Sequence, residues 1–229
     1  MTLDLEGALM SLASVVAAFV IAEAALAAIM AAAWAVQRAT GQTGWIDAIW
    51  TFGVGATGAA LAAAPHGEDG SGWRRAAAAA AISLWALRLG SHIVARTRKA
   101  PDDPRYRKLI DGWGAGASRR LIAFLQAQAL VGSVLAVSVA LAAHAPSPTL
   151  RAQDIGGLVL FAVALIGEAA ADAELTRFKA DPANRGRICD VGLWGRSRHP
   201  NYRAAHARLL SEDPLLPTLL TRRSRSARR

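Results

Sequence analysis

Five long apolar stretches constrain what this chain can fold into. They run over residues 8–36, 45–64, 76–94, 121–143 and 155–175, and most charged residues lie between them. A helix needs about 20 apolar residues to cross the hydrocarbon core of a bilayer. The sequence therefore predicts an all-α fold, a polytopic membrane helix bundle with about five transmembrane helices. The third stretch is the weakest, because its run of alanines is only mildly apolar.

The composition excludes several other classes of protein. Hydrophobic residues make up 53% of the 229 positions and charged residues 19%, so the bulk of the chain is too apolar for an intrinsically disordered protein. Cys189 is the only cysteine, which excludes a disulfide scaffold. The first apolar stretch follows Asp4 and Glu6 rather than basic residues and is too long for the core of a signal peptide, so we expect it to be a membrane span.

The distribution of charge predicts an orientation in the membrane. The net charge is +9, from 26 Lys and Arg against 17 Asp and Glu. Of these basic residues, 22 fall on one side of the predicted spans and three on the other, while Arg88 lies within the third span. Because cytoplasmic loops are enriched in Lys and Arg, we expect the N-terminus outside and the C-terminal region in the cytoplasm. This charge pattern is typical of a membrane protein, so we expect membrane lipids rather than nucleic acid as partners. The arginines at the end of the chain are expected to be a solvated cytoplasmic end, with contact to nucleic acid or anionic lipid as the alternative.

Two familiar site patterns are rejected. Gly53, Gly55 and Gly58 match the G-x-G-x-x-G fingerprint of dinucleotide-binding proteins, but that motif requires a strand–turn–helix setting. Inside a predicted span, these glycines are better explained by close helix packing. The five histidines are scattered and form no zinc-ligand spacing with Cys189, so no metal site is predicted.

Ionisable residues inside the spans are the first functional candidates, since charge in a bilayer is costly. Glu23 lies in the middle of the first span, where it is either a proton-handling acid or a neutral carboxylic acid bonded to another helix. Asp47 begins the second span. The pairs Arg88/His92 and Glu168/Asp172 each share a helix face near the cytoplasmic boundary. They predict a polar pocket for an anionic ligand, with snorkelling to the membrane surface as the alternative.

A dense polar run follows the last span. Residues 198–202 read Arg-His-Pro-Asn-Tyr, and they combine a cation, a proton-exchanging ring, an amide and an aromatic ring. Pro200 disfavours helix at His199, so the run is expected to open on a loop. This set suits a diphosphate and a heteroaromatic ring at a water-accessible membrane edge. An interfacial basic-aromatic anchor is the alternative.

These residues resemble a known family. The run Gly192-Leu193-Trp194, followed by Ser197 to Tyr202, is similar to the C-terminal signature of the steroid 5-alpha-reductase-like membrane proteins, above all their bacterial branch of unknown function. Further matching pieces cover the chain from about residue 45 to 202: Trp45-x-Asp47-x-x-Trp50, Trp85-x-x-Arg88-Leu89, Asp102-Asp103-Pro104-Arg105-Tyr106 and Glu168-x-x-x-Asp172-x-x-Leu175-x-x-Phe178-Lys179.

The resemblance implies a multi-pass enzyme of the bacterial inner membrane that uses NADPH to reduce a C=C bond in a lipophilic enone, steroid-like or other. It also implies which positions contact the cofactor: Glu168, Asp172, Lys179, Asn201 and Tyr202, with Arg105, Arg198 and His199 as phosphate partners. Asp47, Tyr106 and Glu23 are the candidate proton sources.

The end of the chain departs from the family pattern. Further hydrophobic helices are expected after the Asn-Tyr pair, but residues 203–229 form an Arg- and Ser-rich run with no apolar stretch long enough to span. We therefore expect a transmembrane reductase-like domain over 1–202 and a basic, disordered tail over 203–229, the product of a shifted frame or a replaced C-terminus. Loss of one cofactor wall would make such a protein inactive. Two alternatives stay open: a relative of the isoprenylcysteine carboxyl methyltransferases, which use S-adenosylmethionine, and a non-catalytic membrane bundle.

Overall fold

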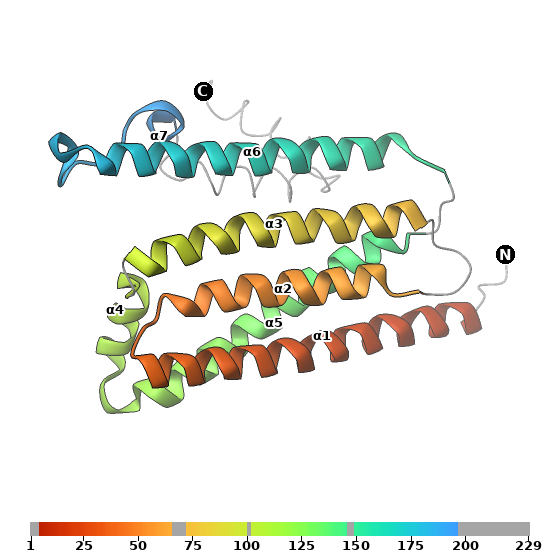
Figure 1. The fold of residues 1–229 in the computed structure, drawn as a ribbon. Helices are drawn as coiled ribbons and strands as arrows, with labels where there is room; N and C mark the ends of the chain where they lie inside the picture. Colours follow the sequence, from red (N-terminus) through yellow and green to blue (C-terminus); the bar gives the residue numbers. More distant parts are fainter. Residues whose placement is uncertain (1–4, 66–71, 100–101, 146–148, 197–229) are drawn as a thin grey trace, which may run out of the picture. The chain divides into compact units, whose positions relative to one another are not determined.

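The structure confirms the predicted fold class. It is a computed structural model that describes residues 5–65, 72–99, 102–145 and 149–196, and in these ranges it contains helices and no strands (Figure 1). Within these ranges, five helices are long and apolar enough to cross a membrane, as predicted. They are α1 (Leu5–Thr40), α2 (Trp45–Ala63), α3 (Gly72–Lys99), α5 (Ala117–Ala143) and α6 (Ala152–Ala180). The third span, which the sequence supported least, is a continuous helix of 28 residues.

The chain divides into two compact units, Met1–Thr149 and Leu150–Arg229. In the first unit, α2 and α5 each pack against the other and against both α1 and α3. The short helix α4 (Pro104–Trp113) and the 3-10 turn η1 (Gly114–Gly116) connect α3 to α5 and lie across one end of the four long helices (Figure 1). The second unit contains α6, the 3-10 turn η2 (Pro182–Asn184) and α7 (Gly192–Arg196).

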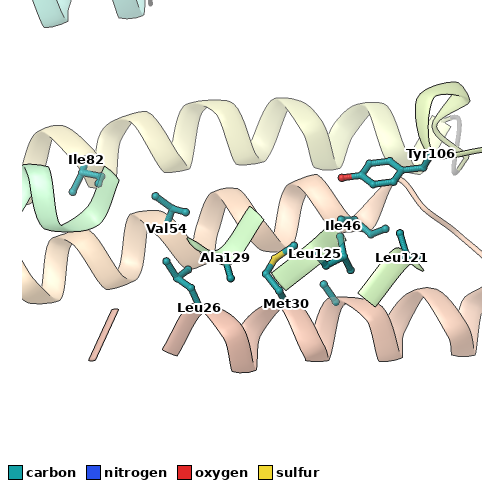
Figure 2. Packing of buried hydrophobic residues seen from close by; sticks show 10 residues of the cluster. Leu26, Met30, Ile46, Val54, Ile82, Tyr106, Leu121, Leu125 and Ala129 are labelled. Atoms are coloured by element: carbon teal, nitrogen blue, oxygen red, sulfur yellow. The ribbon is translucent and has the colours of Figure 1, made fainter. Parts of the chain in front are cut away.

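The core of the first unit is built from side chains of all five of its helices (Figure 2). Because sheets are absent from the described residues, this core depends on helix faces meeting directly. Its buried members are Leu26, Met30, Ala33, Ile46, Val54, Ile82, Tyr106, Leu121, Leu125 and Ala129. A second buried cluster, further from α4, joins α1, α2 and α5 through Ala22, Leu61, Ala136, Val137 and Ala140.

Glycines let the central helices approach closely. Gly53, Gly55 and Gly58 are buried in α2. A Cβ atom added to Gly55 would collide with the Cβ of Ala86 on α3, and one added to Gly58 would lie 2.5 Å from Cδ1 of Ile82. These glycines therefore pack helices together, as the sequence predicted, and belong to no dinucleotide-binding turn.

Basic residues gather at one end of the first unit. The C-terminal turn of α1 carries Arg38, and α3, α4 and the start of α5 bring eight more Lys and Arg side chains to the same end. At the opposite end, Arg74 is only 5% exposed and donates to the carbonyl oxygen of Ala145 over 3.0 Å. The placement of the N-terminus outside the membrane stays a prediction.

The outer surface of the helices is strongly apolar. Leu12 on α1, Leu87 on α3 and Val131 on α5 are each at least 60% exposed, and Ile166 on α6 is 68% exposed. In water such surface would be costly, whereas in a bilayer the acyl chains cover it. The exterior and the five long helices are consistent with a multi-pass membrane protein.

Candidate functional site

Two of the three predicted proton sources lie in direct contact. The hydroxyl of Tyr106 donates to Oδ1 of Asp47 over 2.8 Å. The other carboxylate oxygen of Asp47 accepts from Nη2 of Arg105 over 2.6 Å. Tyr106 is 4% exposed, while the Asp47 side chain keeps 23% of its surface accessible. One carboxylate therefore joins a buried phenol to a guanidinium at the α4 end of the bundle.

Three helices position this pair. Asp47 lies in the first turn of α2, and Tyr106 lies in the first turn of α4. The Tyr106 ring packs edge-on against Phe124 of α5, with 6.2 Å between ring centroids. The side-chain amide of Gln128, one turn further along α5, lies 3.4 Å from the Tyr106 hydroxyl. Trp50 completes the cluster, because its indole nitrogen donates to the carbonyl oxygen of Gln128 over 3.0 Å.

Sequence reasoning missed Gln128. It is uncharged and, like Gln126 two residues before it, belongs to no motif. The signal that was available is that a polar residue inside an apolar span usually has a specific partner.

A second set of polar contacts holds α4 against the start of α2. Thr43 is 3% exposed, donates to Oδ1 of Asp102 over 2.7 Å and accepts from the backbone nitrogen of Asp103 over 3.0 Å. Thr97, at the end of α3, donates to the carbonyl oxygen of Gly44 over 3.0 Å. The α1–α2 and α3–α4 connections are thus bonded to each other, and this fixes the distance between Asp47 and Tyr106.

Asp103 caps α4 and also binds two arginines. Its carboxylate accepts from the backbone nitrogen of Arg105 over 2.9 Å, as an N-cap residue does. The same carboxylate accepts from Nη2 of Arg105 over 2.9 Å and from Arg96 over 3.2 Å. Arg105, predicted to bind a cofactor phosphate, is therefore shared between Asp47 and Asp103, although 62% of its side chain stays exposed.

These contacts keep both loop carboxylates ionised. The hydrogen bond from Arg105 lowers the pKa of Asp103 below its ordinary value, and this outweighs the opposing effect of burial. The hydrogen bond from Thr43, followed by that from Arg107, lowers the pKa of Asp102. The start of α4 is consequently anchored by fixed negative charge at neutral pH.

Glu23 is not part of this cluster. Its carboxylate oxygen Oε2 accepts from Oγ of Ser133 over 2.8 Å, which joins α1 to α5 in the middle of the bundle. Glu23 precedes the end of α1 by 17 residues, or about 25 Å of helix. Of the two sequence interpretations of Glu23, the structure displays the helix–helix hydrogen bond.

Three predicted cofactor contacts share one face of α6 in the second unit. Glu168, Asp172 and Lys179 are separated by four and seven residues, so at 100° per residue they lie within about 40° of one another around the helix. Glu168 and Asp172 are partly buried, and Lys179 is exposed. The remaining predicted contacts, Arg198, His199, Asn201 and Tyr202, lie outside the described residues.

The chain after α6 folds back onto it. The backbone nitrogen of Leu193 donates to Oε2 of Glu174 over 2.9 Å, and the indole nitrogen of Trp194 donates to the carbonyl oxygen of Ala171 over 2.9 Å. Gly192 has φ 55°, a left-handed conformation that favours glycine, and a Cβ there would lie 2.6 Å from Glu174. Glu174 was not predicted, because its partner is a backbone group.

Arg88 and His92 lie one turn apart on α3, and both are partly buried. The predicted convergence of Asp47, this pair and the α6 carboxylates on one pocket stays a prediction. Within the described ranges, no group of three or more His, Cys, Asp or Glu side chains is arranged to hold a metal ion.

Comparison with known families identifies the chain. Residues 33–207, about three quarters of its length, match the family model described as "Protein of unknown function (DUF1295)". The chain belongs to this family. DUF1295 is distantly related to the steroid 5-alpha-reductase-like proteins, which agrees with the resemblance seen in the motifs. No curated protein and no solved structure matched the chain.

The extent of the DUF1295 match separates the candidate residues. Asp47, Tyr106 and every predicted cofactor contact fall inside the matched range, whereas Glu23 precedes it. The match ends at residue 207, so most of the basic tail also lies outside it. The family match thus covers the Asp47–Tyr106 pair and not Glu23, and the role of all three as proton sources stays a prediction.

Proposed function

We propose that this protein is a membrane-embedded, NADPH-dependent reductase of a C=C bond in a lipophilic enone, located in the bacterial inner membrane with its N-terminus outside. The observation that carries the proposal is the hydrogen bond between the buried Tyr106 phenol and the Asp47 carboxylate. Distant relationship to the steroid 5-alpha-reductase-like proteins supports the choice of reaction.

The Asp47–Tyr106 pair suits the polarisation of a carbonyl group. A bound NADPH would supply hydride to the β-carbon of the enone. Reduction then needs a hydrogen-bond donor at the carbonyl oxygen, where negative charge develops. Rotation of the Tyr106 hydroxyl from Asp47 toward the substrate would provide that donor, while Arg105 continues to neutralise Asp47. A proton from water, added at the α-carbon, completes the reduction.

The apolar setting of Tyr106 suits a lipophilic substrate. Phe124 packs against the Tyr106 ring, and the half-buried Trp113 packs at a 58° tilt against Phe124. These rings lie at the end of helices whose outer faces are apolar, so a hydrophobic enone dissolved in the bilayer would meet aromatic side chains before the polar pair.

Cofactor binding is proposed for the face of α6 that carries Glu168, Asp172 and Lys179, together with Arg198, His199, Asn201 and Tyr202. Lys179 is exposed on that face and offers three N–H donors to phosphate oxygens. The two acidic residues suit hydroxyl and amide donors of a nucleotide rather than its phosphates.

The test uses the full chain in nanodiscs with NADPH carrying deuterium at the transferred position and a panel of lipophilic enones. The expected product gains one deuterium at the β-carbon. Tyr106→Phe keeps the ring packing and should lower kcat by about 100-fold or more, the usual loss for a missing hydrogen-bond donor at a developing oxyanion, with unchanged affinity for NADPH. Lys179→Gln and Arg198→Ala should weaken NADPH binding instead.

Three results would contradict the proposal. If NADPH fluorescence does not respond to the wild-type protein, the reductase interpretation fails. If S-adenosylmethionine raises the melting temperature while NADPH does not, the protein is related in function to the carboxyl methyltransferases. If neither compound stabilises it, the protein is a non-catalytic bundle, which is the outcome expected if the altered C-terminus has removed activity.

A further inference from the structure

The basic residues at the α4 end of the first unit fall into two groups. Arg96, Arg105 and Arg107 each bind a carboxylate of the 102–103 loop, with Arg105 also binding Asp47. Arg38 donates to Oγ of Ser118 and lies 5.1 Å from the centre of the Trp34 ring. These four cations have roles within the fold.

The other five cations have no such role within the fold. They are exposed and make no hydrogen bond or ion pair with any residue in the described part of the chain. We call this group the basic collar: Arg98, Lys99, Lys108, Arg119 and Arg120. Asp111 is the one acidic side chain of this end, within the described ranges, that has no bound cation, so the collar carries a clear excess of positive charge.

The collar lies at the level where the helices leave their apolar segments. Arg98 and Lys99 end α3, Lys108 is exposed on α4, and Arg119 and Arg120 are in the first turn of α5. In α4, Tyr106, Ile110 and Trp113 pack inward against the core at helical spacing. On the opposite side of α4 lies the exposed Lys108, and Leu109 is 37% exposed. An amphipathic helix across the end of a transmembrane bundle is suited to the membrane–water interface.

Each part of the collar is followed by apolar surface toward the middle of the bundle. On α3, Leu87 is 61% exposed and Leu84 is 52% exposed. On α5, Phe124 is 36% exposed and Leu130 is 49% exposed. A ligand that meets both surfaces needs an anionic phosphate at one end and hydrocarbon at the other. A soluble phosphate compound would leave the apolar part unmatched.

We propose that the basic collar binds the headgroups of anionic phospholipids, whose acyl chains lie along α3 and α5. The cations hold the phosphates of the leaflet at the α4 end and so fix the depth of α4 in the membrane. The five cations of this site are none of the residues proposed for catalysis or cofactor binding, so the proposal does not depend on the reductase function.

The test compares brominated phosphatidylglycerol with brominated phosphatidylcholine as quenchers of tryptophan fluorescence, with the full chain reconstituted in vesicles. The expected result is preferential binding of phosphatidylglycerol by the wild-type protein. The variant Lys108→Gln/Arg119→Gln/Arg120→Gln should reduce that preference by about fivefold or more. A loss of about fivefold is what the removal of a single cation at a charged membrane surface would cause, so it is the minimum expected for three.

The matched control is Arg222→Gln/Arg223→Gln/Arg225→Gln, which removes the same charge from the tail. It should leave the preference unchanged. Equal quenching of the wild type by both lipids, or an equal loss of preference in the tail variant, overturns the proposal. Should the collar variant fail to fold, the tail variant at increasing ionic strength gives the decision. Its preference for phosphatidylglycerol must fall with salt if the exposed collar cations bind the headgroups, and an unchanged preference overturns the proposal.

Discussion

The contact between α2 and α3 at Gly55 gives a sharp prediction of stability. Gly55 of α2 lies against Ala86 of α3, and a Cβ at position 55 would collide with the Cβ of Ala86. Because a Cβ has no rotamer to change, Gly55→Ala must push the two backbones apart. Overpacking of this kind costs about 1–3 kcal/mol, and we expect the upper half of that range. Better helix propensity returns about 1 kcal/mol, so the net loss of unfolding free energy is about 1–2 kcal/mol.

The control and the rescue are both present in this chain. A methyl group added to Gly156 of α6 would meet no described atom within 4 Å, so Gly156→Ala should leave stability unchanged or raise it by up to about 1 kcal/mol. The double variant Gly55→Ala/Ala86→Gly exchanges the methyl group between helices and should regain stability close to that of the wild type. Unfolding in mixed detergent micelles, followed by tryptophan fluorescence, measures all four proteins. Equal stability of Gly55→Ala and Gly156→Ala, or no recovery in the double variant, would refute the packing role.

Three further predictions concern the polar contacts. Thr43→Val removes one donor and one acceptor and should lower the unfolding free energy by about 1–3 kcal/mol, while Thr43→Ser retains both bonds and most of the stability, as chemical denaturation would show. The pKa of Asp103 is lower in the folded state than the ordinary carboxyl value of 3.8. Its contribution to stability is therefore fully present above pH 3.8 and is lost as the pH falls through the lower folded-state value. In a series of melting temperatures against pH, Asp103→Asn should reduce this fall in stability at acid pH. Glu174→Ala should speed amide hydrogen exchange at Leu193, and unchanged exchange would contradict the anchoring of α7.

The spans were predictable because the bilayer imposes a simple requirement on composition. Each predicted stretch coincides with a helix, and every helix except α2 extends further than its apolar run. α3 begins before the predicted 76–94 stretch and continues to Lys99, since Arg, Thr and Lys are compatible with helix beyond the hydrocarbon core. The short helix α4 was not predicted as an element. Its signal was the Asp103-Pro104 pair, an N-cap followed by proline at the first helical position.

The candidate site was predictable in part, for a different reason. Asp47 and Tyr106 were singled out in separate motifs, and the structure brings them to 2.8 Å although 59 residues separate them. Their pairing depends on Thr43 and Gln128, which hold α4 and the phenol in place. Uncharged residues of this kind carry no periodic or compositional signal, so only the packed helices reveal them.

The charged residues at the α4 end of the bundle are assigned to two separate roles, lipid binding by the collar and catalysis around Tyr106, and this separation can be tested. Carboxylates and their bound arginines surround Tyr106, while the collar cations face outward and make no contact with the described carboxylates. Neutralising the collar should therefore change lipid preference and leave kcat with saturating NADPH unaltered. Tyr106→Phe should do the reverse, because the phenyl ring preserves the packing of α4 against Phe124. If neutralising the collar instead abolished NADPH binding without altering lipid preference, its cations would belong to the cofactor site. Only the role proposed for the Asp47–Tyr106 pair would then stand.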